Sequence, residues 1–385
     1  MSHTDFSQRA PDYIRAIAPY QGGRPIGEIA RQFGFSEDQI VKLASNENPL
    51  GMSPKARQAM LRASEDLGRY PDGNGFELKQ AIAKKFGLPE NTITLGNGSN
   101  DILELVAHTF LKPGVESVYS DHSFAVYALA TQATGAKAVV VPADPKTLGN
   151  DLAGLRAAVT PETAVIWLAN PNNPTGSFLP GADLYAFLKD LPLSVLLVLD
   201  EAYTEFLSPA DRYNAFEWIA EFPNLLISRS FSKAYGLAGL RVGYGVAHPG
   251  VTDLLNRVRQ PFNVNSLAQA AATAALFDDD FLQTSYDCNQ NGLMQLSQGL
   301  KAMGFDVLPS RGNFVLVDLS ARQSGAQPSA ALGARVFEAL LAKGVITRPV
   351  GNYGLPNHLR ISVGTAEENQ VFLMAMTEVV EAMWR

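Results

Sequence analysis

Between residues 91 and 248 the chain alternates short apolar runs with segments long enough to form helices, and this alternation constrains the fold more than any other feature. Each run is apolar on both faces, which is typical of strands in a parallel sheet that is covered on both sides. We therefore expect an α/β fold with a mostly parallel, seven-stranded sheet between helices. The seven runs are Thr92–Leu95, Ser117–Ser120, Ala138–Val141, Ala164–Ala169, Val195–Leu199, Leu225–Ser228 and Val242–Ala247.

After residue 261 the pattern changes. Helical stretches rich in Ala, Leu and Gln come first, and two strand-like runs then flank a further helix, so a smaller α+β domain is predicted. The expected helices are Leu267–Leu276, Asn289–Met303 and Ala330–Lys343, and the expected strands are Asn313–Leu319 and Leu359–Val363.

These two patterns predict the domain organisation. A large domain is expected at 51–265 and a small C-terminal domain at 266–385. Residues 1–50 contain Pro and Gly residues and a short helical stretch, Ile26–Phe33, and predict an N-terminal arm that also forms part of the small domain.

Composition excludes several classes of protein. The 385 residues are 46% hydrophobic, and 31 Lys and Arg against 38 Asp and Glu give a net charge of −7. This acidic balance argues against nucleic acid or an anionic membrane as a partner, and no apolar run approaches the ~18 residues of a membrane span. The single cysteine, Cys288, and the absence of an apolar signal segment predict a cytoplasmic protein. Five scattered His residues show no metal-ligand spacing, so no metal site is expected.

Three neighbouring runs of the predicted sheet end in polar clusters. Each cluster alone has a structural explanation, as a turn or a helix cap. Parallel α/β sheets, however, bind ligands beyond the carboxyl ends of their strands, so we expect Asn173, Asp200 and Lys233 to converge on one site. The clusters are Asn170–Gly176 (NPNNPTG), Asp200–Tyr203 (DEAY) and Ser228–Lys233 (SRSFSK).

An Asp, a Tyr three residues later and a Lys on the next strand suit the chemistry of pyridoxal phosphate. The Lys233 amine would form a Schiff base with its aldehyde, and the Asp200 carboxylate would keep its pyridine nitrogen protonated. The ring can then accept electrons released at the substrate's α-carbon. Asn173 and Tyr203 would hydrogen-bond the phenolic oxygen of the ring and lower the pKa of the neighbouring imine.

Such a site also needs a cradle for the phosphate. Gly98, Ser99 and Asn100 follow the first apolar run and begin a helical pattern, and a glycine-led helix N-terminus favours a bound anion. Taken alone, Ser99 or Asn100 could merely cap that helix. Further phosphate partners are expected from a guanidinium and two hydroxyl groups, those of Arg241, Ser230 and Ser232.

Two more residues are candidates. Phe124 could stack on the face of the cofactor ring, or it could be a core residue. Arg360 lies inside an apolar strand of the small domain, and an arginine is seldom buried without a partner. It could form a structural ion pair, or it could bind a carboxylate or phosphate of the substrate.

Together these motifs resemble the fold-type-I pyridoxal-phosphate aminotransferases over nearly the whole chain. Phe124 departs from the pattern, because many relatives have Tyr there, so a hydroxyl contact is lost while stacking survives. Further segments resemble the histidinol-phosphate aminotransferases. They are Ala18–Tyr20 with Arg24–Ile26, Leu43–Gly51, Tyr70–Asp72, Gly96–Asp101 and Gly344–Pro349.

This resemblance implies a homodimer in which Tyr70 reaches the cofactor phosphate of the neighbouring subunit. It implies an arm, including Tyr20 and Asn46, that closes over the substrate, and it implies that Arg348 and Arg360 hold the substrate's acidic end. Two plainer explanations stay open, an exposed loop for Tyr70 and a solvated side chain for Arg348.

The implied reaction is pyridoxal 5′-phosphate-dependent transfer of an amino group between L-histidinol phosphate and 2-oxoglutarate, a step of L-histidine biosynthesis. The products are imidazole acetol phosphate and L-glutamate. The freed amine of Lys233 would carry the proton from the substrate's Cα to the cofactor.

Several alternatives remain. A broad-specificity aminotransferase for phenylalanine and tyrosine would use the same catalytic residues, and a pyridoxal enzyme for phosphoserine or threonine phosphate is a more distant possibility. The segment Ser230–Lys233 matches the S-x-x-K of penicillin-binding acyltransferases, but the S-D-N and K-T-G elements of those enzymes are missing. A ligand-sensing domain of a transcription regulator would need a basic helix-turn-helix, and only a short arm precedes the predicted fold.

Overall fold

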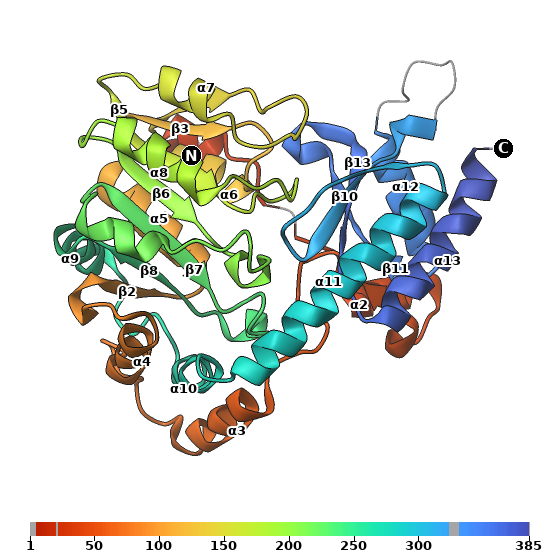
Figure 1. The fold of residues 1–385 in the computed structure, drawn as a ribbon, viewed down its shortest axis with the longest axis horizontal. Coiled ribbons are helices and arrows are strands. Elements are labelled where there is room, and N and C mark those ends of the chain that lie inside the picture. Colours follow the sequence, from red (N-terminus) through yellow and green to blue (C-terminus); the bar gives the residue numbers. More distant parts are fainter. Residues whose placement is uncertain (1–4, 21, 323–330, 385) are drawn as a thin grey trace.

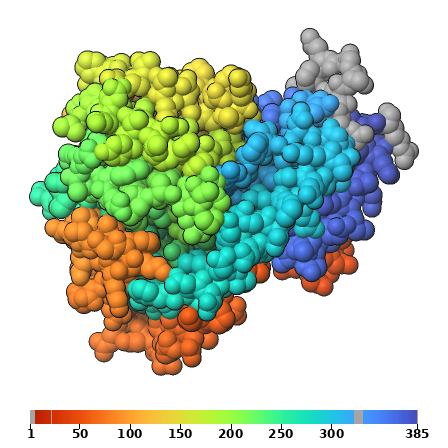
Figure 2. All heavy atoms as spheres, viewed as in Figure 1, coloured from red at the N-terminus to blue at the C-terminus, as the bar shows by residue number. Residues whose placement is uncertain are grey.

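The computed structural model describes residues 5–20, 22–322 and 331–384. Two bodies lie side by side: a larger one is built on a seven-stranded sheet, and a smaller one contains the C-terminal helices (Figure 1). The long helix α11 (Asp279–Ala302) runs from the edge of the larger body into the smaller one. In the space-filling view the blue atoms of the C-terminal part pack directly against the green and yellow atoms of the larger body (Figure 2).

The central sheet has the strand order β2-β8-β7-β6-β5-β3-β4. Neighbouring strands are parallel except around β8, which is antiparallel to both β7 and β2. The predicted α/β class is therefore confirmed, and each of the seven predicted runs forms a strand. The strands are β2 (Ile93–Gly96), β3 (Glu116–Ser120), β4 (Lys137–Val141), β5 (Thr163–Ala169), β6 (Leu196–Asp200), β7 (Leu225–Ser230) and β8 (Gly243–Ala247).

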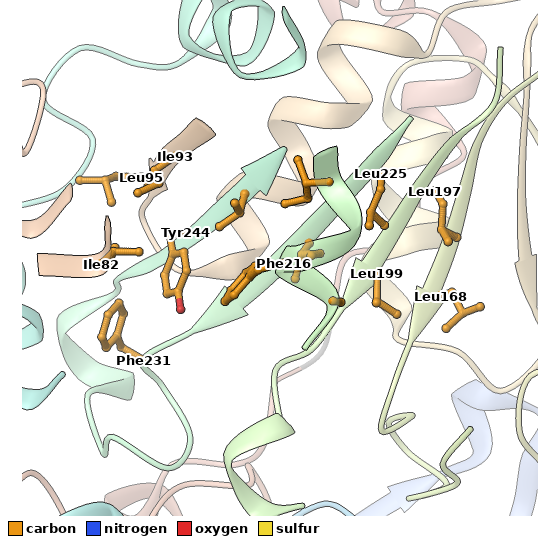
Figure 3. Close-up of a cluster of buried hydrophobic side chains, with 14 of the residues drawn as sticks. Ile82, Ile93, Leu95, Leu168, Leu197, Leu199, Phe216, Leu225, Phe231 and Tyr244 are labelled. Atoms are coloured by element: carbon orange, nitrogen blue, oxygen red, sulfur yellow. The ribbon is translucent and has the colours of Figure 1, made fainter. Parts of the chain in front are cut away.

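Both faces of this sheet are apolar, because successive strand residues point to opposite sides. On β6, Leu197 and Leu199 belong to one buried cluster and Val198 to the other. Figure 3 shows the first cluster, in which Leu197 and Leu199 lie near Leu168 and Leu225. Complete burial of such a side chain contributes about 1.5–3 kcal/mol.

Helices cover both clusters. Those of the first are α3 (Pro54–Ala63), α4 (Phe76–Phe86), α7 (Leu152–Ala157), α8 (Gly181–Asp190) and α10 (Ser266–Ala275). Those of the second are α5 (Ser99–Phe110), α6 (Ala125–Ala133) and α9 (Pro249–Val258).

The smaller body has a four-stranded antiparallel sheet with the order β12-β13-β10-β9. Its apolar face packs on α11, α12 (Leu332–Leu341) and α13 (Ala366–Met383), which confirms the predicted α+β character. The strands are β9 (Asp306–Leu308), β10 (Phe314–Asp318), β12 (Arg348–Val350) and β13 (Leu355–Ser362).

Part of the N-terminal region is built into this smaller body. Strand β1 (Val41–Lys42) pairs in parallel with β11 (Val345–Ile346), and α2 (Ile26–Phe33) packs on residues of α12 and β11. Before α2 lies the short helix α1 (Asp12–Arg15). The domain boundaries after residues 50 and 265 stay predictions.

Helix α11 begins ten residues earlier than the sequence pattern predicts. Its first three turns are mostly polar, and of residues 279–288 only Ser285 is buried, so no apolar periodicity marks them. The acidic pair Asp279 and Asp280 in the first turn stabilises this end of the helix through the helix dipole. Of the helices described, none is both long enough and apolar enough to cross a bilayer.

Candidate active site

The carboxyl ends of β5, β6 and β7 form one wall of a cavity of about 250 Å³. The three strands are in register, with Ala169 beside Asp200 and Asp200 beside Ser228, so the polar clusters that follow them meet. The smaller body and the segment 44–47 supply the opposite wall. Of the residues predicted from sequence, the wall contains Tyr20, Asn46, Ser99, Asn100, Phe124, Asn173, Asp200, Tyr203, Ser230, Ser232, Lys233, Arg241, Arg348 and Arg360.

Asp200 is the last residue of β6 and is 5% exposed. Its Oδ2 accepts a hydrogen bond from the Tyr127 hydroxyl at 2.9 Å, whereas its Oδ1 is buried and has no hydrogen-bond partner in the described chain. Burial raises the pKa of Asp200 to about 6, although the Tyr127 hydrogen bond acts in the opposite direction. A buried carboxylate oxygen without a partner is costly, so this wall is suited to a ligand that brings a donor.

Lys233 follows β7 and points its amine toward the same space. Its Nζ donates to the carbonyl oxygen of Ser45 at 3.2 Å and lies 5.7 Å from the centre of the Tyr203 ring. Burial, reinforced by the charge of Arg360, lowers the pKa of Lys233 to about 8. More of this amine is therefore neutral at pH 7 than in an exposed lysine, and a neutral amine can act as nucleophile or base.

The Tyr203 hydroxyl is held by a chain of hydrogen bonds from the smaller body. It accepts from Asn46 Nδ2 at 2.9 Å, and Asn46 Oδ1 accepts from the hydroxyl of Ser362 at 2.9 Å. The Asn46 backbone N–H also donates to Ser362 Oγ at 2.8 Å. Burial raises the pKa of Tyr203 to about 12, so the hydroxyl keeps its proton and can donate to a ligand.

One end of the cavity is built for an anion. Gly98 has a φ of +88° and lies against Arg241, where a Cβ would come within 2.4 Å of Nη2. Arg241 Nη1 lies 3.5 Å from the Ser232 hydroxyl, and the Ser232 backbone N–H donates to Ser230 Oγ at 3.0 Å. A guanidinium and two hydroxyl groups therefore meet at one place.

The helix α5 begins at this same end. Its N-cap residue is Gly98, and no side chain caps the helix, so the explanation that Ser99 or Asn100 merely caps it is wrong. The opposing strand residue is Gly243, where a Cβ would lie 2.5 Å from the Ser99 nitrogen. The Asp101 N–H donates to the Gly98 carbonyl oxygen at 3.2 Å, which leaves the N–H groups of Ser99 and Asn100, ahead of it in the first turn, available to an anion.

Arg360 on β13 is 6% exposed and faces the cavity from the smaller body. Its Nη1 donates to Asn173 Oδ1 and its Nη2 to the Ala44 carbonyl oxygen, each at 2.6 Å. Its Nε is buried without a hydrogen-bond partner, and no carboxylate of the described chain lies within 4.0 Å of the guanidinium. The structural ion pair that could have explained a buried arginine is thus missing from the described residues.

Arg348 and Tyr20 lie at the mouth of the cavity. The guanidinium carbon of Arg348, on β12, is 5.8 Å from the centre of the Tyr20 ring. Both residues, together with Phe124 and Tyr353, also line an adjoining cavity of about 810 Å³ between the two bodies. Arg348 is therefore placed where a bound ligand could reach it, rather than in open solvent.

Two predicted residues are not part of the cavity wall. Gly98 lies behind Arg241, as described above. Tyr70 is 83% exposed and stacks on Phe262, with ring centres 4.7 Å apart. Within one chain, Tyr70 contacts neither Lys233 nor the anion-binding end.

Sequence reasoning missed two residues that touch the predicted ones. Tyr127 contacts Asp200, and its position in the first turn of α6, three residues after the N-cap residue Phe124, could have indicated that the two lie close together. Ser362 contacts Asn46, and it lies two residues after Arg360 on one strand, so the two share a face of the sheet.

The arrangement suits a flat ligand with an anionic group at one end and a basic nitrogen at the other. The anionic group fits the end formed by α5 and Arg241, and the nitrogen fits Asp200 Oδ1. Lys233 lines the same cavity with a reactive amine, and Arg360 offers a second anion site from the smaller body.

Comparison with known proteins agrees with this geometry. Residues 38–376 match the family model of class I and II aminotransferases. The histidinol-phosphate aminotransferase 2 of Ralstonia nicotianae is 58% identical over 369 residues, which are 96% of each chain. That of Methylobacillus flagellatus is 54% identical over 372 residues, 97% of each chain.

Solved structures show the same fold. The histidinol-phosphate aminotransferase of Sinorhizobium meliloti, in complex with pyridoxal-5′-phosphate, superposes with a TM-score of 0.86 at 31% identity and covers 97% of this chain and 98% of its own. An aspartate aminotransferase of Thermus thermophilus shares the fold, with a TM-score of 0.82 at 23% identity over 96% of this chain and 99% of its own. By the family model and by its relatives, the chain belongs to the class I and II aminotransferases and, within them, to the histidinol-phosphate aminotransferases.

Proposed function

We propose that this protein is a pyridoxal 5′-phosphate-dependent histidinol-phosphate transaminase. It transfers an amino group between L-histidinol phosphate and 2-oxoglutarate, giving imidazole acetol phosphate and L-glutamate, a step of L-histidine biosynthesis. The observation that carries the proposal is the cavity in which Lys233, Asp200 and Arg241 line one side and Arg360 the other. The near-full-length identity to histidinol-phosphate aminotransferases supports the substrate.

The residues present fit the cofactor. The orphaned Oδ1 of Asp200 can accept a proton-bearing ring nitrogen, and the glycine at position 98 leaves room for Arg241 beside a bound phosphate. Phe124 lines the same wall and can cover the ring, while Asn173 and Tyr203 can donate to its phenolic oxygen. When bound, pyridoxal 5′-phosphate supplies an aldehyde that takes up the amino group and a ring that withdraws electrons.

Lys233 performs two tasks in this proposal. Its amine would hold the cofactor between turnovers. During turnover its Nζ would take the proton from the substrate's Cα and deliver it to the cofactor. The lowered pKa of Lys233, about 8, places a useful fraction of neutral amine at physiological pH. Asp200 keeps the ring nitrogen protonated, which stabilises negative charge that moves into the ring.

Arg360 and Arg348 bind the acidic ends of the two substrates. Glutamate presents a carboxylate and histidinol phosphate presents a phosphate ester, and a guanidinium can pair with either through parallel hydrogen bonds. Arg360 has a free Nε and no carboxylate partner in the described chain, so an incoming anion meets an unpaired positive charge. Tyr20 lies beside Arg348, where it can donate to the same group.

We also propose a homodimer in the cytoplasm. The supporting observation is a group of large apolar side chains that are exposed along residues 50–76, where Tyr70 also stacks on the exposed Phe262; exposed apolar surface of this kind is typical of an interface. The group includes Leu50, Leu61, Leu67 and Phe76. The single cysteine is consistent with a reducing compartment.

A set of half-reactions tests the function. The purified enzyme is mixed in turn with histidinol phosphate, glutamate, phenylalanine and tyrosine, and absorbance follows conversion of the bound cofactor to its amine form. Histidinol phosphate and glutamate should react fastest. Equal or faster reaction with phenylalanine and tyrosine would replace the proposal by a broad aromatic aminotransferase, which the aromatic lining of the adjoining cavity could accommodate.

A further inference from the structure

We infer that Tyr127 is a positioning residue, which fixes the Asp200 carboxylate so that Oδ1 is left for the ring nitrogen of the cofactor. This inference rests on the proposed function. It concerns a residue that touches Asp200 but does not line the cavity itself.

The position of Tyr127 is fixed from three sides. It lies in the first turn of α6, its ring stacks on Trp167 of β5 with centres 5.6 Å apart and planes 6° apart, and its edge meets the Phe124 ring at 5.9 Å. The side chain is fully buried, so its hydroxyl has little freedom to choose another partner. Its single hydrogen bond therefore decides which oxygen of Asp200 remains free.

The hydroxyl also acts on the charge of Asp200. A donor to the carboxylate favours its ionised form, and the Lys233 charge and the Ala202 backbone act in the same direction. Burial and the neighbouring Glu201 act in the opposite direction and leave the pKa at about 6. The other titratable group close by, Tyr203, stays protonated at neutral pH because its pKa is about 12. Tyr127 is thus the largest of the influences that keep Asp200 ionised.

The test compares two ligands in Tyr127→Phe, which removes one oxygen atom and keeps the ring on Trp167. The full-length protein, freed of cofactor, is titrated with pyridoxal 5′-phosphate and with its analogue in which carbon replaces the ring nitrogen, and protein fluorescence gives each Kd. We expect the substitution to weaken binding of pyridoxal 5′-phosphate by roughly ten-fold, the scale of a hydrogen bond to a charged group. Binding of the analogue should change by less than about two-fold, because it brings nothing for Asp200 to hold.

A pH series gives a second readout. Without the Tyr127 hydroxyl the pKa of Asp200 rises, so the carboxylate becomes protonated at a higher pH and can no longer pair with a protonated ring nitrogen. The pH below which pyridoxal 5′-phosphate binds weakly should therefore move up by about one unit in Tyr127→Phe. If Tyr127 served only to pack against Trp167, its hydroxyl would not matter and the pH dependence of cofactor binding would stay unchanged.

Tyr185→Phe is the matched control. The Tyr185 ring lies against Trp218 with centres 5.7 Å apart, and its hydroxyl donates to the Glu221 carboxylate at 2.7 Å, but Tyr185 does not line the cavity. This variant should bind both ligands as the unchanged protein does. Equal losses for both ligands in Tyr127→Phe, or no loss for either, would overturn the inference while leaving the proposed function intact. Asp200→Asn should weaken binding of pyridoxal 5′-phosphate more than binding of the analogue. If it changes the two Kd values equally, the role of Asp200 itself is wrong and both proposals fall.

Discussion

Arg360 Nη1 donates to Asn173 Oδ1 at 2.6 Å, although the two residues are 187 positions apart in the chain. Asn173 follows β5 in the larger body and Arg360 belongs to β13 in the smaller one, so this bond joins the two bodies across the cavity. Both residues are buried, and both are expected to touch ligands, Asn173 the cofactor and Arg360 the substrate. Under the proposed function, the substrate site and the cofactor site would therefore share a hydrogen bond.

This pair predicts the effect of Arg360→Lys. A lysine keeps the charge, but its single nitrogen lacks the planar fork by which Arg360 reaches Asn173 with Nη1 and Ala44 with Nη2 while Nε stays free. We expect kcat/KM to fall in both half-reactions, by a loss of transition-state stabilisation on the order of 2–4 kcal/mol, because each substrate needs the same anion partner. A loss confined to histidinol phosphate, measured by single-turnover absorbance, would show that glutamate uses another residue.

Lys233→Ala removes the amine that should bond to the cofactor and move the proton. The cofactor would then be held only by its phosphate and ring contacts, and transamination should be abolished. Mass spectrometry after borohydride treatment checks the covalent link, which should be lost in this variant and present in the unchanged protein. Near-normal turnover of Lys233→Ala without added amines would show that another base acts.

The fold was predictable because it depends on patterns that repeat along the chain. Most strands of the central sheet are short runs apolar on both faces, because helices cover both faces of the sheet. The edge strand β4 is less covered, since four of its five residues are not buried, but its valines still mark it as a strand. The polar clusters after β5, β6 and β7 were predictable for the same reason, since parallel strands in register bring their ends together.

Contacts between distant segments were not predictable in this way. The hydrogen bond of Asn46 to Tyr203 and that of Ser362 to Asn46 depend on how the two bodies pack, and no local periodicity encodes it. The first turns of α11 were missed for a related reason, because a helix that buries little leaves no apolar stripe.

Asp200→Asn should stabilise the cofactor-free protein while impairing catalysis. The folded pKa of Asp200, about 6, lies above its ordinary value of 3.8, so the folded state prefers the protonated carboxyl and loses that stability as pH rises through 6. At pH 8 the asparagine variant should gain about 1–3 kcal/mol in free energy of unfolding, and the gain should shrink as pH is lowered toward 4. Urea denaturation at several pH values measures this, and a gain independent of pH would contradict the assigned cause.

Tyr70 should act on the cofactor of the other subunit. Tyr70→Phe keeps the stacking on Phe262 and removes one hydroxyl, so cofactor binding should weaken by roughly ten-fold if that hydroxyl reaches a phosphate. A mixed dimer, with Tyr70→Phe in one subunit and Lys233→Ala in the other, shows whether the Tyr70 hydroxyl acts on the cofactor of its own subunit or on that of its partner. Action across the interface leaves one intact site per mixed dimer and restores tight cofactor binding there, whereas action within one chain leaves none.

Substrate choice should depend on Arg348. It lies beside Tyr20 and is the cross-strand neighbour of Arg360, and unlike Arg360 it also lines the adjoining cavity. This position suits the phosphate ester that distinguishes histidinol phosphate from an ordinary amino acid. Arg348→Ala should therefore lower kcat/KM for histidinol phosphate by an amount on the order of 2–4 kcal/mol, as expected when a charged partner is lost from a desolvated site. The glutamate half-reaction should change much less.

Arg311→Ala is the matched control for this substitution. Arg311 pairs with Asp211 at 2.6 Å and does not line the cavity, so its loss removes the same charge from the protein without touching the substrate. It should leave both half-reactions within about two-fold of the unchanged enzyme, because distant surface charges are screened. Equal losses on both substrates in Arg348→Ala, or no loss on either, would favour the broad aromatic aminotransferase, since an enzyme for phenylalanine and tyrosine has no phosphate ester to recognise.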